Sequence, residues 1–205
     1  MLFRSRVLSI SVSSSLLSGT LPSSIGNFGS VTYMSFYYNK IGGTIPSTIG
    51  ELTSLQTLDL TGNSLVGTIP STMSVLTSLR YLWMYNNLLS GTIPSTMSVL
   101  TSLQDLWLSS NSLVGSIPST ISALTLLQIL NLNNNYLTMG GATSVPISTF
   151  SSTTLSGTIS LADNCLVFDT TSPYPYRHVT ATHCRSTGKY EVWCQNFQYS
   201  IVIIY

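Results

Sequence analysis

A 13-residue segment, GTIPSTMSVLTSL, occurs twice without change in this chain, at residues 67–79 and again at residues 91–103. Looser copies place the first glycine of the segment at regular intervals of 24 residues, at Gly19, Gly43, Gly67, Gly91 and Gly115. A fixed period of about 20 to 30 residues is typical of solenoids, in which each repeat packs only on its neighbours. The period therefore predicts a single stack of similar coils.

A column of asparagines sets the register within each repeat: Asn39, Asn63, Asn87, Asn111 and Asn135. The side chains eight, five and three residues before each asparagine, and two after it, are apolar. In the Asn63 repeat, Leu58 and Leu60 alternate with a polar residue, which is the period of a strand with one buried face. We expect one such strand per repeat, stacked about 4.8 Å from the next in a parallel sheet.

Each repeat reads LxxLxLxxNxLxGxIPxxIxxLxx, which resembles the plant-type class of leucine-rich repeats. This class occurs in plant receptor-kinase ectodomains and polygalacturonase-inhibiting proteins, and protist surface proteins with GT(L/I)P repeats are similar. The resemblance covers about residues 7–166. It implies an α/β-type, right-handed solenoid with a parallel concave sheet and short helical or 3-10 segments outside. It also implies that each asparagine amide bonds to backbone groups of the turns, so that it avoids the penalty of about 1–3 kcal/mol for an unpaired buried group.

The first residues fit two descriptions. Arg4 and Arg6 precede a mildly apolar run, as in a signal peptide. One period before Asn39, however, Ser15 is surrounded by apolar residues at all four template positions, namely Val7, Ile10, Val12 and Leu17. We favour a first repeat, and a chain that begins inside a repeat is typical of a fragment because terminal units normally need a cap.

The period slips after Leu137, where MGGATSVP replaces the expected GTIP. The next asparagine of the ladder, Asn164, comes five residues late, and an insertion of this kind usually forms a loop before a cap. We expect a solenoid of about seven units over residues 1–166, a cap over 167–185 and a poorly ordered tail over 186–205.

Three cysteines stand in the last repeat and beyond it. Terminal caps of related repeat proteins are commonly disulfide-bonded, so the resemblance implies a Cys165–Cys184 bridge, an oxidising compartment and an extracellular or cell-surface location. Free thiols in a reducing compartment are the alternative. A metal site at Cys184 with His178 and His183 would need more ligands than this spacing supplies.

Composition excludes several classes of function. Charged residues make up 6% of the chain and the formal net charge is +1, so the basic face that nucleic-acid binding needs is missing. No run approaches the roughly 18–20 apolar residues of a membrane span. Asp59 and Asp105 fit an inverting glycosidase pair only loosely, and no GxSxG or phosphate-binding motif is present. We therefore expect no enzymatic activity, cofactor or metal.

The residues between the buried leucines should form the concave face. They include aromatic residues in three repeats, those of Asn39, Asn87 and Asn111. Trp83 and Trp107 share a column on adjacent strands, so their rings should touch or stack. Aromatic side chains on a rigid sheet are typical binding anchors, although strands also favour them for structural pairing. The expected ligand-binding residues are Tyr33, Tyr37, Tyr81, Trp83, Tyr85, Asp105 and Trp107.

Two functions are compatible with this face. A recognition module would bind a protein, peptide or glycan on it, whereas a structural or adhesive surface protein would use the repeats only as a spacer.

Overall fold

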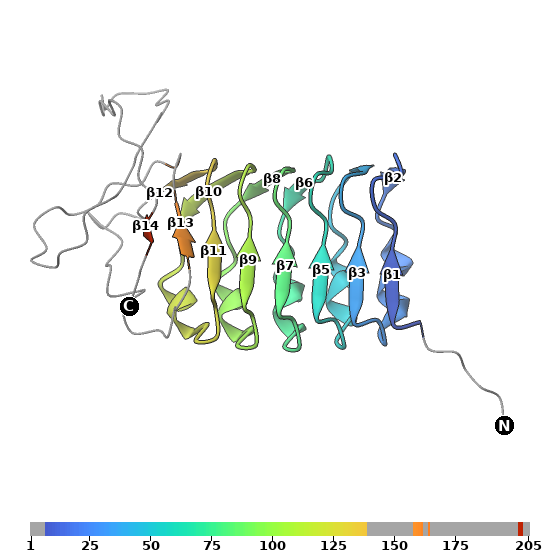
Figure 1. Ribbon diagram of the computed structural model, residues 1–205, viewed down its shortest axis with the longest axis horizontal. Helices are drawn as coiled ribbons and strands as arrows, with labels where there is room; N and C mark the ends of the chain where they lie inside the picture. The colour runs from blue at the N-terminus through green and yellow to red at the C-terminus, as the bar shows by residue number, and fades with distance from the viewer. Residues whose placement is uncertain (1–6, 139–157, 162–163, 165–200, 203–205) are drawn as a thin grey trace, which may run out of the picture.

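The computed structural model describes residues 7–138, 158–161, 164 and 201–202. The chain winds into a row of similar coils stacked along one axis (Figure 1). From residue 7 to residue 124, each coil contributes a main-sheet strand, an outer extended segment and a 3-10 turn, in that order. The predicted parallel-sheet solenoid with short outer 3-10 segments is thus confirmed.

The main sheet has eight strands, one from each successive coil and a last one near the C-terminal end. In spatial order they are β1 (Ser9–Ser11), β3 (Tyr33–Ser35), β5 (Thr57–Asp59), β7 (Tyr81–Trp83), β9 (Asp105–Trp107), β11 (Ile129–Asn131), β13 (Thr158–Ser160) and β14 (Ile201–Val202). All neighbours are parallel except β13 and β14. Leu130 of β11 pairs with Ile159, five residues beyond the regular spacing, so the sheet continues across the insertion.

The outer extended segments form two smaller parallel sheets. The first pairs β2 (Ser18–Thr20) with β4 (Lys40–Gly42), and the second contains β6 (Val66–Thr68), β8 (Leu88–Gly91), β10 (Ser112–Ser116) and β12 (Tyr136–Thr138). A bridge between Thr44 and Val66 connects the two. The glycine that begins each GTIP segment has a positive φ, for example +77° at Gly67, and it therefore turns the chain where other residues would be strained.

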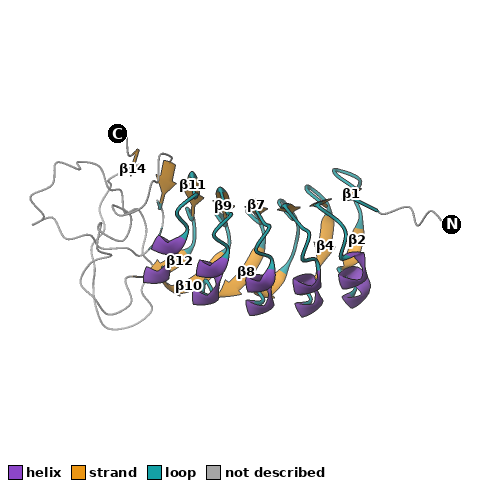
Figure 2. Ribbon diagram, turned by 90° about the horizontal axis from the view of Figure 1, so that it is seen from below, coloured by secondary structure: helices purple, strands orange, loops and turns teal. Residues whose placement is uncertain are grey.

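A 3-10 turn follows the extended segment in each of five coils: η1 (Ser23–Phe28), η2 (Ser47–Glu51), η3 (Ser71–Val75), η4 (Ser95–Val99) and η5 (Ser119–Ala123). A proline precedes each turn, after leucine in the first coil and after isoleucine in the other four; it lacks an N–H and its φ is fixed near the helical value. These turns line one side of the solenoid, away from the main sheet (Figure 2). Met73, Leu76 and Leu79 face inward and are fully buried, as their spacing predicts.

One apolar core runs through the stack and is built mainly from leucine and isoleucine. In the main sheet, the middle residue of each of the strands β3, β5, β7, β9 and β11 points into this core. Leu58, Leu82 and Leu106 have no exposed surface. The first coil pairs in register with the second, because Ser9 of β1 lies opposite Tyr33 of β3. Several of its apolar side chains, such as Val7, Leu8 and Leu16, are nevertheless exposed, because among the described residues no coil packs on their other side.

The asparagine column forms a hydrogen-bonded ladder. The Oδ1 atom of Asn87 accepts a bond from the N–H of Leu65 (3.1 Å), while its Nδ2 group donates to the carbonyls of Leu60 (2.9 Å) and Met84 (3.2 Å). Asn39, Asn63, Asn111 and Asn135 repeat this pattern. Asn164 continues it across the insertion, accepting from the N–H of Leu137 and donating to the carbonyl of Leu132. The ladder therefore joins each coil to the one before it.

Cys165, Cys184 and the expected cap over residues 167–185 lie outside the described residues. Of the expected tail, Ile201–Val202 pair with β13, and the remainder also lies outside them.

Candidate binding site on the concave face

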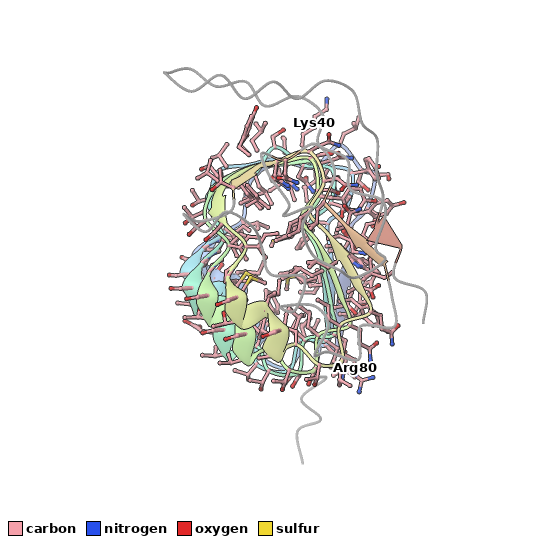
Figure 3. The ribbon with its side chains drawn as sticks, turned by 90° about the vertical axis from the view of Figure 1, so that its left-hand side faces the viewer. Lys40 and Arg80 are labelled. Atoms are coloured by element: carbon pink, nitrogen blue, oxygen red, sulfur yellow. The ribbon has the colours of Figure 1, made fainter. Side chains whose placement is uncertain are left out.

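Two columns of side chains line the outward surface of the main sheet, because the first and third residues of each strand point away from the core. The third residues form one column of Ser35, Asp59, Trp83, Trp107 and Asn131. The first residues form the other, of Tyr33, Thr57, Tyr81, Asp105 and Ile129. Figure 3 looks along the stack, with the main sheet on one side and the 3-10 turns on the other.

We call the seven aromatic side chains on or beside β3, β7 and β9 the aromatic patch: Tyr33, Tyr37, Tyr38, Tyr81, Trp83, Tyr85 and Trp107. The three tyrosines of the β3 coil are the most exposed, and Tyr38 retains 49% of its accessible surface. The four aromatic residues of the β7 and β9 coils are half-buried. The sheet therefore carries exposed rings on the β3 coil and partly covered rings on the β7 and β9 coils, with the β5 strand between the two groups.

The ring contacts differ from the stacking expected for the two tryptophans. Trp83 and Trp107 are paired in register, but Trp83 contacts Tyr81, with 5.7 Å between ring centroids and 44° between planes. Trp107 contacts Tyr85 instead (5.5 Å, 47°), and the described residues include no contact between the two indoles. The prediction of stacking was wrong because each indole makes a tilted contact with a tyrosine in place of the other indole. Tyr81 lies two residues before Trp83 on the same strand, and Tyr85 lies diagonally across from Trp107.

Both indole N–H groups are buried and have no hydrogen-bond partner. Buried polar groups of proteins are nearly always paired, and an exception calls for an explanation. Neighbouring side chains cover both nitrogens, so in this geometry a bound molecule meets the faces and edges of the rings and not the two donors.

Tyr38 belongs to this surface, although the sequence pattern did not select it. Its ring lies above Gly62, where an added Cβ would stand 2.7 Å from the tyrosine Cδ1 atom, and it meets Tyr37 edge to face (5.2 Å, 78°). Its φ of +51° is left-handed, a conformation that costs a bulky residue about 1–2 kcal/mol. The equivalent residues of other coils include Gly62, Asn86 and Asn134, which tolerate this conformation better.

Strained residues of this kind cluster at functional sites. The signal available in the sequence was the position of Tyr38 directly before a ladder asparagine, where the turn imposes a positive φ in every repeat described.

Two carboxylates flank β7. Asp59, which is 9% exposed, lies opposite Trp83 and accepts a hydrogen bond from the N–H of Thr61 (3.0 Å). Asp105 is half-buried opposite Tyr81, and burial raises the pKa of its carboxyl group. The two acids occupy different columns, two strands apart, as the repeat register predicts.

Two tyrosine hydroxyls complete the polar part of the surface. The hydroxyl of Tyr81 donates to Oε1 of Gln104 (2.9 Å). The pKa of Tyr85 is raised, first by burial and then by the neighbouring Tyr38 hydroxyl and Asp59 carboxylate. The three coils of β3, β5 and β7 therefore contribute to one connected group of rings and acids.

Over the described part of the chain, no three histidine, cysteine, aspartate or glutamate side chains gather as metal ligands would. The described helical turns also include none of the length and apolarity needed to cross a bilayer.

A model of the leucine-rich repeat region matches residues 3–134, which is more than half of the chain. No curated protein matches the sequence. Among solved structures, the chain is similar to the leucine-rich repeat ectodomain of the plant membrane receptor kinase GASSHO1/SCHENGEN3 from Arabidopsis thaliana, in complex with CASPARIAN STRIP INTEGRITY FACTOR 2. The identity is 32%, the TM-score is 0.67, and the match covers 77% of this chain but only 20% of that ectodomain.

Two further structures have comparable identity. The plant peptide hormone receptor RGFR1, in complex with RGF2, is 30% identical over 72% of this chain and 31% of its own, with a TM-score of 0.52. The BIR3–SERK2 complex from Arabidopsis thaliana is 34% identical over 69% of this chain and 78% of the matched one, with a TM-score of 0.57. The chain thus belongs to the leucine-rich repeat family, and its repeats are of the plant type.

Proposed function

We propose that this chain is a non-enzymatic recognition module that binds a protein or peptide on its concave face, outside the cell or at its surface. The aromatic patch and Asp105 would make the contacts. The observation that carries the proposal is the gathering of exposed and half-buried rings on one face of the sheet. Rigid aromatic side chains supply large contact area at low cost in conformational entropy.

The related structures support a peptide or protein ligand. GASSHO1/SCHENGEN3 and RGFR1 were each solved in complex with a partner, and RGFR1 is described as a peptide hormone receptor. The outer side of this chain offers a weaker alternative, because its 3-10 turns present mainly Ser and Thr, with isolated exposed valines such as Val75 and Val99.

A displayed library of random peptides, selected on the purified chain, tests the proposal. Enriched peptides should bind the wild type and lose at least about tenfold in affinity for a Trp83→Ala, Trp107→Ala double variant. A Val75→Ala, Val99→Ala double variant, altered only on exposed positions of the outer side, serves as the matched control. It should bind as the wild type does.

Circular dichroism should show that both double variants are folded. Equal binding by the tryptophan variant and the wild type would refute the proposal. So would a selection that enriches no peptide on the wild type, and that result would favour the structural spacer. Binding on a glycan array without peptide binding would assign the face to sugars instead.

A further inference from the structure

The aromatic patch is flanked by negative charge. Asp59 on β5 and Asp105 on β9 lie on either side of β7, and each stands directly opposite one of its rings, Trp83 and Tyr81 respectively. The two carboxylates therefore stand at diagonally opposite corners of three adjacent strands, with the rings of β7 between them. This arrangement places negative charge on both sides of the central aromatic rings.

Neither carboxylate has a counter-charge among the described residues. Within residues 7–138, the Asp105 carboxylate forms no hydrogen bond or ion pair, and the Asp59 carboxylate accepts only the bond from the backbone N–H of Thr61. Asp105 is half-buried, so much of its hydration has been lost without a partner to replace it. A desolvated carboxylate without a partner is unfavourable, and a cation relieves that cost best.

The cations of this region lie away from the centre of the patch. Lys40 and Arg80 are the basic residues of the described chain, and they lie at opposite ends of the coil in cross-section, beyond the two ends of the strands (Figure 3). Both are exposed, and neither forms an ion pair with a described carboxylate. The middle of the concave face is therefore acidic and aromatic, with its positive charges at the margins.

We propose that the concave face selects a cationic ligand, a lysine or arginine side chain of a protein or peptide, held at Asp105 over the ring of Tyr81, with the Asp59 carboxylate beside Trp83 adding to the negative potential. This inference rests on the proposed function and specifies its ligand. Ammonium and guanidinium groups are attracted to the faces of tryptophan and tyrosine, most strongly where water is displaced. Asp105 supplies charge-assisted hydrogen bonds to this group, whereas Asp59, two strands away, attracts it over a longer distance.

A neutral ligand fits this surface less well. It would cover Asp105 further and leave the carboxylate without a counter-charge, whereas the ring contacts alone are equally available to neutral and cationic side chains. An acidic ligand would add like-charge repulsion from both aspartates. Charge complementarity therefore favours a basic segment.

The test uses three matched peptide libraries, with arginine, glutamine or glutamate fixed at one central position between random flanks. The wild-type chain should enrich binders from the arginine library most strongly. Replacing the central arginine of an enriched peptide by glutamine should weaken binding about tenfold, and raising the salt from about 50 to 500 mM should weaken it further.

Isosteric variants assign the effect to the two acids. Asp105→Asn should lower affinity for the arginine peptide severalfold. Asp59→Asn, which keeps an acceptor for the Thr61 N–H, should lower it to a smaller extent. Glu51→Gln, at an exposed carboxylate on η2, is the matched control and should change affinity less than twofold. Affinity for glutamine-centred peptides should hardly respond to either aspartate change.

Enrichment from the glutamine or glutamate library equal to that from the arginine library would refute the cationic ligand. Unchanged affinity in both asparagine variants would also refute it. In either case, loss of binding in the Trp83→Ala, Trp107→Ala variant would leave the proposed function standing. If that variant also bound normally, both proposals would fall together.

Discussion

The asparagine ladder allows a stability change to be worked out from individual hydrogen bonds. In an Asn87→Ala variant, the N–H of Leu65 loses its partner in a fully buried position. The carbonyl of Leu60 still accepts from Asn63, and that of Met84 still accepts from Asn111. The substitution therefore leaves one buried donor unpaired, at about 1–3 kcal/mol, and removes two bonds to carbonyls that keep another partner, at about 0.5–1.5 kcal/mol each.

We expect the free energy of unfolding to fall by about 2–6 kcal/mol. Urea unfolding followed by tryptophan fluorescence and by far-ultraviolet circular dichroism would measure it, and coincident transitions would justify a two-state treatment. Asn86→Gly is the matched control. Asn86 is exposed and has a φ of +54°, which glycine adopts readily, so its loss should change stability by less than about 0.5 kcal/mol.

A second substitution at the same position separates the donor from the acceptor role. Asn87→Asp keeps an acceptor for the Leu65 N–H but directs a carboxylate oxygen at the carbonyls of Leu60 and Met84. At neutral pH it should destabilise the fold at least as much as alanine, because a buried charge then faces two acceptors. A loss below about 1 kcal/mol for either variant would show that the amide does not carry the inter-coil bonding that we infer.

Three further predictions follow from single positions. Gly67→Ala should cost about 1–2 kcal/mol, because φ is +77° and the new Cβ would lie 2.9 Å from Thr44 Cγ2; adding Thr44→Ser should recover only the steric part in urea unfolding. Tyr38→Asn should change stability by less than about 1 kcal/mol, since relief of the left-handed strain offsets lost ring contacts, yet it should weaken binding of library-derived peptides. Burial raises the pKa of Asp105 in the folded state, so ionisation of this carboxyl destabilises the fold as the pH rises through that pKa. Asp105→Asn should thus raise the melting temperature at pH 7 but not at about pH 3, where the wild-type carboxyl is protonated; equal shifts at both pH values would contradict this reasoning.

Most of the main sheet could be predicted because one pattern fixes strand, register and buried face together. The alternation around each ladder asparagine places Leu58, Leu82 and Leu106 in the core and pairs them directly. The pattern also locates Asn164 after an insertion, since the spacing within the repeat is unchanged there. The pairing of the outer strands was not predictable in the same way. Val66 pairs with Leu88 rather than with its equivalent one period later, and no alternation of side chains marks that shift.

The concave face shows where a repeat pattern stops being informative. Register alone places Trp83 beside Trp107 and Asp59 beside Trp83, and both placements hold. Ring orientation depends instead on which neighbours are large, and those neighbours differ between coils that share an identical GTIPSTMSVLTSL segment. The turn before the ladder position imposes a left-handed residue in each of the six coils from Ser14 to Asn134. Only the Asn39 coil has a tyrosine there, and its ring extends over the next coil at Gly62. Recognition by this face is therefore expected to depend on the differences between repeats, and substitutions that exchange RYLWMYN with QDLWLSS should alter binding while leaving the shared scaffold intact.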